Sequence, residues 1–352
     1  MQFQLASSNR YGTQGYGHFH GIVGKDGRAA TVEQRFYEQI GGKIGLCTCS
    51  ILSAAQEPLP KPYQPSGLSD NIRQTIASEP DVTELVQMSL RLLPIEATID
   101  GVVVLSHDAT LKRCFGVDRK IADCDWEYIS GLRTLREPHE PMPRLLDLVN
   151  YLAQPKLAHI WLLLDIKLDN NANDIMRCTA KVFEEVSAPF DTLWEDRVVL
   201  GCWAANYFSL CEAYFPGYPV VHIGFSVPYS SQFLAIENIG YIMLQETLVS
   251  PLGRSFIRDA RAAQRPILSW SVDNEIGLDL CVRRELDGVV TDNPKKLLEL
   301  RESSIKSGRP LAWSVRRIAS VLRINMIIWV FNFIYGRKYG FGLDQRYTTK
   351  SH

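Results

Sequence analysis

The sequence predicts an α/β protein built as a TIM-type (β/α)8 barrel, in which helices surround a closed ring of eight parallel strands. Two observations carry this prediction. Apolar runs of strand length recur from about residue 100 onward, and amphipathic stretches of helix length separate them. The runs also stop abruptly at polar residues, as in Val102–Asp108 and Pro266–Asp273. A parallel barrel carries its chemistry at the carboxyl ends of its strands, where such residues would stand.

Seven apolar runs are predicted to be strands, at 102–106, 160–166, 197–202, 219–224, 240–244, 266–272 and 288–291. Six stretches between them are predicted to be helices, at 143–153, 172–186, 204–215, 230–238, 253–264 and 275–285, and Pro294 is predicted to start another over 295–302. Strand–helix alternation without hairpins implies right-handed parallel crossovers. A doubly wound open sheet is the alternative, but no glycine-rich phosphate loop follows any of these strands.

The start of the barrel is atypical. Residues 1–95 mix Gly, Gln, Ser and Pro without an apolar run of strand length, so they are predicted to be poorly structured, and only Val82–Leu93 has a helical pattern. The barrel is therefore incomplete, because it lacks a recognisable first strand and much of its second. We divide the chain into an atypical region over 1–95, a barrel over 96–303 and a C-terminal segment over 304–352.

Composition limits the class of protein. With 352 residues and a formal net charge of −1, the chain can hold one large domain plus appendages and has no basic excess for nucleic acid. The eight cysteines are scattered, and the Cys47-Xaa-Cys49 pair lacks the second ligand pair of a zinc site. The N-terminus has no apolar run of signal-peptide length. We interpret the cysteines as reduced thiols and the protein as intracellular.

The C-terminal segment has a different character. No acidic residue occurs between Lys306 and Lys338, and an apolar run extends from Ile324 to Tyr335. This run is shorter than the roughly 20 residues of a spanning helix. We predict that residues 316–338 bind a membrane surface, with Trp329 and Tyr335 as interfacial anchors and arginines facing anionic headgroups. A helix packed on the barrel and a tilted span are the alternatives.

Four blocks carry a resemblance to a known family. Residues 103–116, which contain His107-Asp108, resemble the His-Asp block of the glycerophosphodiester phosphodiesterases. Leu162–Lys167 resembles the Glu-Ile-Lys strand of that family, and Trp270–Pro294 resembles its two closing blocks. The likeness covers about residues 95–300 and is nearest in character to fungal phosphatidylglycerol phospholipase C. It implies metal-dependent hydrolysis of a glycerophosphodiester or a glycerophospholipid such as phosphatidylglycerol, with Mg²⁺ or Ca²⁺ as cofactor.

The resemblance also implies roles for individual residues. His107 matches a family histidine that acts as acid or base, Asp165 stands where the family has a glutamate metal ligand, and Lys167 would balance phosphate charge. The period of a strand places Asp165 and Lys167 on the same face. Trp270 and Trp203, both near strand ends, are predicted to line the substrate pocket.

The sequence departs from the family at its start. The family's His-Arg-Gly and Glu-Asn-Thr strings are missing, and Leu92 and Pro94 occupy the positions of a Glu-Xaa-Asp metal pair. Other residues of suitable type are unconvincing as replacements, namely His18, His20, Glu79, Asp81, Glu96 and Asp100. Two explanations stay open. The chain is a membrane-bound barrel that has lost its chemistry, or a gene model misassigns the first 95 residues, which the abrupt change near residue 98 favours.

Overall fold

The computed structural model describes residues 46–48, 89–137, 139–158, 160–188, 193–291 and 315–335. Contacts divide them into two compact units. The N-terminal unit contains residues 89–218, and the C-terminal unit contains residues 46–48 and the described residues from 219 onward. Several sequence predictions fall outside the described residues, namely those on His18, His20, Glu79, Asp81 and the helix over 295–302.

The sheet of the N-terminal unit contains β2 (Ser89–Ala97), β3 (Val103–Leu105), β4 (Ile160–Ile166) and β5 (Val198–Cys202). Strand β4 lies between β2 and β5 and is parallel to both, whereas β3 runs antiparallel to β2. Every residue of β4 and β5 is buried. Continuous apolar runs of this kind are expected for parallel strands that are covered on both faces.

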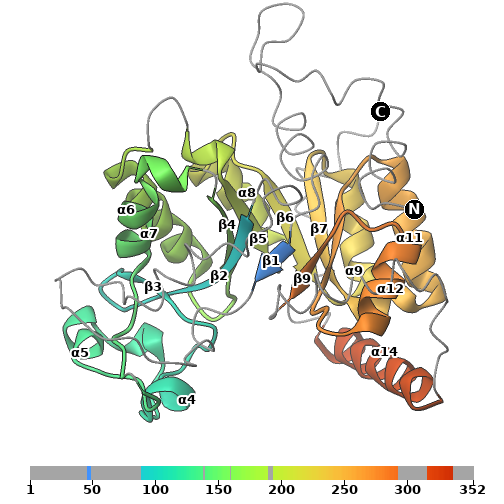
Figure 1. The fold of residues 1–352 in the computed structure, drawn as a ribbon, viewed down its shortest axis with the longest axis horizontal. Helices are drawn as coiled ribbons and strands as arrows, with labels where there is room; N and C mark the ends of the chain where they lie inside the picture. Colours follow the sequence, from blue (N-terminus) through green and yellow to red (C-terminus); the bar gives the residue numbers. More distant parts are fainter. Residues whose placement is uncertain are drawn as a thin grey trace, which may run out of the picture. The chain divides into compact units, whose positions relative to one another are not determined.

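The helices of the N-terminal unit are α4 (Lys112–Phe115), η2 (Ile121–Asp123), α5 (Trp126–Ser130), α6 (Leu145–Leu152), η3 (Pro155–Leu157), α7 (Ala172–Glu185), η4 (Trp194–Asp196) and α8 (Asn206–Tyr214). The side chain of Asn171 caps α7 by accepting from two backbone N–H groups of its first turn. Ile175, Thr179 and Phe183 form part of a buried stripe along α7. Figure 1 shows α6 and α7 together on one side of the β2–β4 pair.

Strand β2 corrects the prediction for the start of the barrel. Residues 89–93 were expected to continue a helix from Val82, but they belong to a nine-residue strand. Seven residues of β2 pair with β4, from Ser89 opposite Ile160 to Ile95 opposite Ile166. The pairing with a buried neighbour outweighs the local helical period, because β-structure depends on partners that are distant in sequence. The second barrel strand is therefore present, and the run at 102–106 is the short antiparallel strand that follows it.

The sheet of the C-terminal unit contains β6 (Val220–Gly224), β7 (Ile239–Leu244), β8 (Ile267–Trp270), β9 (Gly288–Thr291) and β1 (Leu46–Thr48), all parallel to their neighbours. Strand β1 was not predicted, and it pairs with the last strand, β9. Asp287, directly before β9, has a structural role, since its carboxylate accepts from the N–H of Ile267 at 2.8 Å. With β2, β4 and β5, the described residues supply eight parallel strands, the number in a (β/α)8 barrel.

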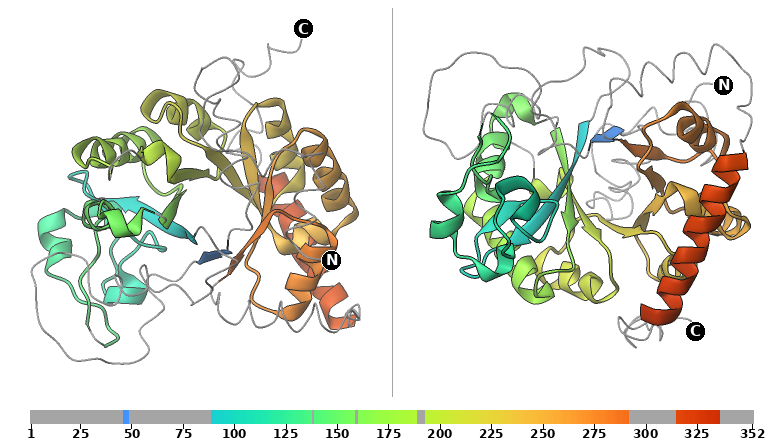
Figure 2. Two further views of the ribbon diagram at one scale, coloured as in Figure 1. Left: turned by 45° about the horizontal axis from the view of Figure 1, so that its top comes forward. Right: turned by 90° about the horizontal axis from the view of Figure 1, so that it is seen from below.

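The helices of the C-terminal unit are α9 (Val227–Ser230), η5 (Ser231–Ala235), α10 (Gln245–Val249), α11 (Pro251–Ala262), α12 (Glu275–Arg283) and α14 (Val315–Tyr335). Helix α14 lies along the outside of this unit (Figure 2). Asn325 anchors it, because its side-chain amide donates to the carbonyl of Glu246 at 3.1 Å. In the part of the chain that is described, every helix is too short or too polar to cross a membrane.

Candidate active site

A buried ion pair stands at the carboxyl end of β4. Asp165 is only 3 % exposed, although it belongs to a strand whose other residues are apolar. Its Oδ2 lies 2.7 Å from Nζ of Lys167, and its Oδ1 accepts from the indole Nε1 of Trp203 at 2.6 Å. Both carboxylate oxygens are thus satisfied, as a buried charge requires. The structure brings together three of the five residues that the sequence singled out.

The register of β4 and β5 explains this arrangement. Ile166 pairs with Cys202, so Trp203 follows β5 directly beside the end of β4. Lys167 Nζ lies 5.5 Å from the centre of the Trp203 ring, within reach of a cation–π interaction. The hydroxyl of Tyr207 donates to the carbonyl of Lys167 at 3.1 Å. An ammonium group held in this way can balance the charge of a bound anion.

Glu96 is a second buried carboxyl group on the same face of the sheet. Pro94 pairs with Asp165, and Glu96 follows two residues later, so its side chain points to the same side as those of Asp165 and Lys167. Burial raises the pKa of Glu96 to about 7, against a lowering by a hydrogen bond from Asn170. Its Oε1 is buried with no hydrogen-bond partner among the described residues. A carboxyl group with a pKa near neutrality is available for proton exchange.

Sequence reasoning set Glu96 aside because it stands two residues beyond the family's acidic positions. The signal that identifies it is strand register, which becomes visible only when β2 is paired with β4. Asp100, the other nearby candidate, has a structural role. It accepts from the hydroxyl of Thr98 at 2.5 Å and from the backbone N–H of Trp126 at 3.1 Å.

His107 lies on the bend after β3, and its side chain is 59 % exposed. Its Nδ1 is 3.0 Å from Oδ1 of Asp108, whose other oxygen pairs with Arg113 at 2.5 Å. The hydrogen bond from Arg113 lowers the pKa of Asp108, which stays ionised and orients the imidazole. The N–H of Ser106 donates to the carbonyl of Pro94, which places His107 near the level of Asp165 and two strands away. That separation is about 10 Å between strand backbones.

Trp270 ends β8 in the C-terminal unit and is partly buried. Its indole Nε1 donates to the carbonyl of Gly224 at 3.3 Å, which links the ends of β6 and β8. His222, near the end of β6, is 1 % exposed, and the centre of its ring lies 4.5 Å from that of Phe233. Its Nε2 is 3.0 Å from the hydroxyl of Ser230, so His222 is a satisfied core residue.

The described residues do not fit the three-carboxylate metal centre that the resemblance implies. Nowhere in this part of the chain do three or more His, Cys, Asp or Glu side chains come close enough to hold an ion. The carboxylate of Asp165 already contacts Lys167 and Trp203, and the carboxyl group of Glu96 contacts Asn170. The predicted cation therefore stays a prediction.

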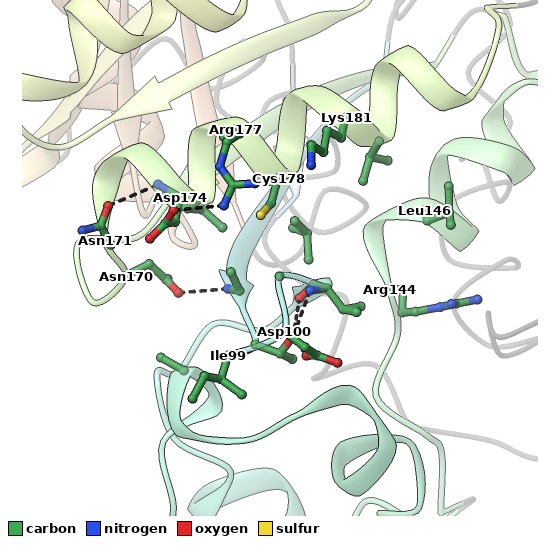
Figure 3. Close-up of a pocket in the computed structure, with 18 of the residues that line it drawn as sticks. Ile99, Asp100, Arg144, Leu146, Asn170, Asn171, Asp174, Arg177, Cys178 and Lys181 are labelled. Carbon is green, nitrogen blue, oxygen red and sulfur yellow. Dashed lines mark hydrogen bonds and ion pairs between the residues drawn. The ribbon is translucent and has the colours of Figure 1, made fainter.

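A polar cavity of about 640 Å³ lies between the turn after β2 and helix α7 (Figure 3). Asn170 forms part of its wall, and its side-chain oxygen accepts from the N–H of Ala97 at 3.0 Å. That bond turns the amide nitrogen of Asn170 toward Glu96. The cations of this wall are largely neutralised, since Arg177 pairs with Asp174. Asn170, a residue of the cavity wall, therefore helps to fix the side chain of Glu96. Asp165, Lys167 and His107 are not among the residues that line the cavity.

Comparison with known proteins places this geometry in a family. Residues 95–296, more than half of the chain, match the model of the glycerophosphoryl diester phosphodiesterase family. The structure is similar to that of an Oleispira antarctica phosphodiesterase, solved in complex with the product sn-glycerol-3-phosphate. The TM-score is 0.52 with 16% identity over 60% of this chain and 85% of that chain. A glycerophosphodiester phosphodiesterase from Parabacteroides distasonis gives a TM-score of 0.51 with 17% identity over 61% of this chain and 84% of that chain. These likenesses confirm the barrel-type fold class.

The raised pKa of Glu96 predicts a specific dependence of stability on pH. The carboxyl ionises near pH 4.5 in the unfolded chain and near pH 7 in the folded one. Its contribution is therefore fully present below pH 4.5 and is lost as the pH rises through 7, by about 3 kcal/mol. Glu96→Gln should remove this loss, so the variant should be more stable than the native chain at pH 8 but not at pH 4.5.

Denaturant unfolding at both pH values measures the effect, and Glu184→Gln on the exposed face of α7 is the matched control. An equal pH dependence of the native chain and the Glu96→Gln variant would contradict the assignment.

Proposed function

Because the chain belongs to the glycerophosphoryl diester phosphodiesterase family, we propose that it hydrolyses glycerophosphodiesters at the carboxyl end of β4. The observation that carries the proposal is the buried Asp165–Lys167 pair, which stands inside the matched segment and on the face where a parallel barrel binds ligands. A buried ammonium at such a strand end suits an anionic substrate.

The reaction needs three groups. A water oxygen bonds to phosphorus while the bond from phosphorus to the leaving alcohol oxygen breaks. A base accepts the water proton, and an acid supplies a proton to the leaving oxygen. We assign one of these proton transfers to His107, whose imidazole Asp108 orients. The third group is Lys167, whose ammonium balances the charge of the phosphoryl oxygens. Trp203 keeps Asp165 in place and lines the substrate site.

The exposed apolar face of α14 favours a lipid substrate over a soluble one. Ile318, Leu322, Met326 and Trp329 repeat at intervals of three or four residues, so they form one stripe, and each is at least 45 % exposed. Val321, three residues after Ile318 and therefore beside this stripe, is buried. We propose that this stripe rests on a cytosol-facing membrane, with a glycerophospholipid such as phosphatidylglycerol as the substrate. The packed helix, which the sequence left open as an alternative, has support in the contact of Asn325 with Glu246 of α10.

The competing proposal is a barrel that keeps the fold and has lost the chemistry. The sequence favours it, because the His-Arg-Gly string is absent and Leu92 and Pro94 stand where the family has its Glu-Xaa-Asp pair. The two proposals differ in turnover, and both are compatible with membrane binding.

The hydrolase proposal predicts turnover of glycerophosphocholine or of phosphatidylglycerol vesicles, measured with Mg²⁺, with Ca²⁺ and with EDTA. His107→Ala should lower kcat/KM at least 100-fold, since a positioned acid or base contributes on the order of 10² to 10⁴. His139→Ala is the control, because His139 is also exposed in the N-terminal unit. No turnover of either substrate by the native chain, under any of these conditions, would establish the inactive barrel instead.

The membrane proposal predicts that Leu322→Gln with Met326→Gln weakens sedimentation with phosphatidylglycerol vesicles at least tenfold. The reason is that each substitution removes exposed apolar surface that the bilayer would bury. Leu252→Gln removes an exposed leucine from α11 in the same unit and should have no effect. Unchanged sedimentation of the α14 variant would refute the role of this helix.

A further inference from the structure

Five arginines surround a hollow on the surface of the C-terminal unit. Arg254, Arg258 and Arg261 come from α11, and Arg283 and Arg284 stand at the end of α12. The hollow has a volume of about 600 Å³, and the one acidic residue in its lining is Glu285. We call it the arginine hollow.

The sequence of α11 produces one wall of the hollow. Phe256, Ile257 and Ala260 are buried in the unit, so the arginines between them stand on the outer side of the helix. Arg261 joins this wall to α12, because its guanidinium donates to the carbonyl of Arg284 at 2.9 Å. Its other terminal nitrogen lies 3.7 Å from the carboxylate of Glu285. The two helices are therefore held at a fixed spacing around the hollow.

Ion pairs within each helix leave donors of two arginines available. Arg258 Nε contacts Asp259 at 3.0 Å, and Arg283 Nε contacts Asp279 at 2.7 Å. Neither aspartate lines the hollow. Nη2 of Arg258 also donates to the hydroxyl of Ser255 at 2.9 Å. A guanidinium group has five N–H donors, so each of these two arginines keeps further N–H groups for a ligand.

Arg254 and Arg284 are the strongest indication of an anion site, since neither has an ion-pair partner in the part of the chain that is described. Burial and then the charge of Arg254 lower the pKa of Arg284, which means that two like charges stand close together. Arg254 does not stabilise the end of α11, because this residue lies near the N-terminal end of the helix, where the helix dipole disfavours a cation. A bound anion would relieve this repulsion.

We propose that the arginine hollow binds a multivalent phosphate-bearing anion. Planar guanidinium groups bind phosphate oxygens through two parallel hydrogen bonds, and several of them around one hollow match more than one negative charge. The same chemistry is supplied by a soluble diphosphate and by the headgroup of an anionic phospholipid. The site is separate from the Asp165–Lys167 pair in its residues, so its ligand need not be the substrate.

The test uses the full-length native chain and Arg254→Gln with Arg284→Gln. Arg119→Gln with Arg136→Gln is the control, because it removes the same charge from exposed arginines of the N-terminal unit. Binding of inorganic pyrophosphate is measured by calorimetry, and binding of phosphatidylglycerol vesicles by sedimentation against phosphatidylcholine vesicles. The native chain should bind at least one of the two phosphate probes, and the Arg254/Arg284 variant should bind it at least tenfold more weakly while the control does not change.

Loss confined to pyrophosphate assigns a soluble ligand, and loss confined to the vesicles assigns a lipid headgroup. Loss with both probes supports the shared phosphate chemistry. The proposal is overturned if the native chain binds neither probe, or if the variant and the control bind as the native chain does. Turnover of glycerophosphocholine by the variant should stay at the native value, which separates this result from the catalytic proposal.

Discussion

A buried acidic side chain in a strand whose other residues are apolar is the constraint on which the N-terminal unit depends. Asp165 lies where a charge has almost no access to water. It is tolerated because Lys167 and Trp203 satisfy both of its oxygens. Removing one partner of such a buried pair costs on the order of 3–5 kcal/mol, since the other charge stays behind unpaired. The ends of β4 and β5 are therefore fixed relative to each other, so the side chains of the candidate site are held in place.

Asp165 and Glu96, the two buried carboxyl groups on one face of this sheet, are stabilised in different ways. Asp165 has a counterion at hydrogen-bond distance, whereas Glu96 has an amide partner and a pKa near neutrality. Asn170 is central to the second arrangement, because the N–H of Ala97 fixes the direction of its amide. A site that contains a fixed cation and a group that exchanges protons has two of the elements that phosphodiester hydrolysis needs.

Most of the strands and the placement of Asp165 and Lys167 follow from the sequence. Buried parallel strands such as β4 appear in the sequence as long apolar runs. Because side chains alternate between the two faces of a strand, Asp165 and Lys167 lie on one face. Strand β2 was not predictable in this way, because its pairing with β4 decides its conformation and β4 is about 70 residues away. The partnership of Trp203 with Asp165 and the position of Glu96 both depend on such pairings. Local patterns contain no information about register between distant strands.

The central claim is that Asp165 and Lys167 act as one unit on the reacting phosphodiester. The most direct test is a double-mutant cycle of Asp165→Asn and Lys167→Met, with kcat/KM measured on glycerophosphocholine and folding followed by circular dichroism. Each single variant should fold and lose at least 100-fold in kcat/KM, and the double variant should lose no more than the worse single one. Native activity in either folded single variant, or fully additive losses in the double variant, would contradict the claim.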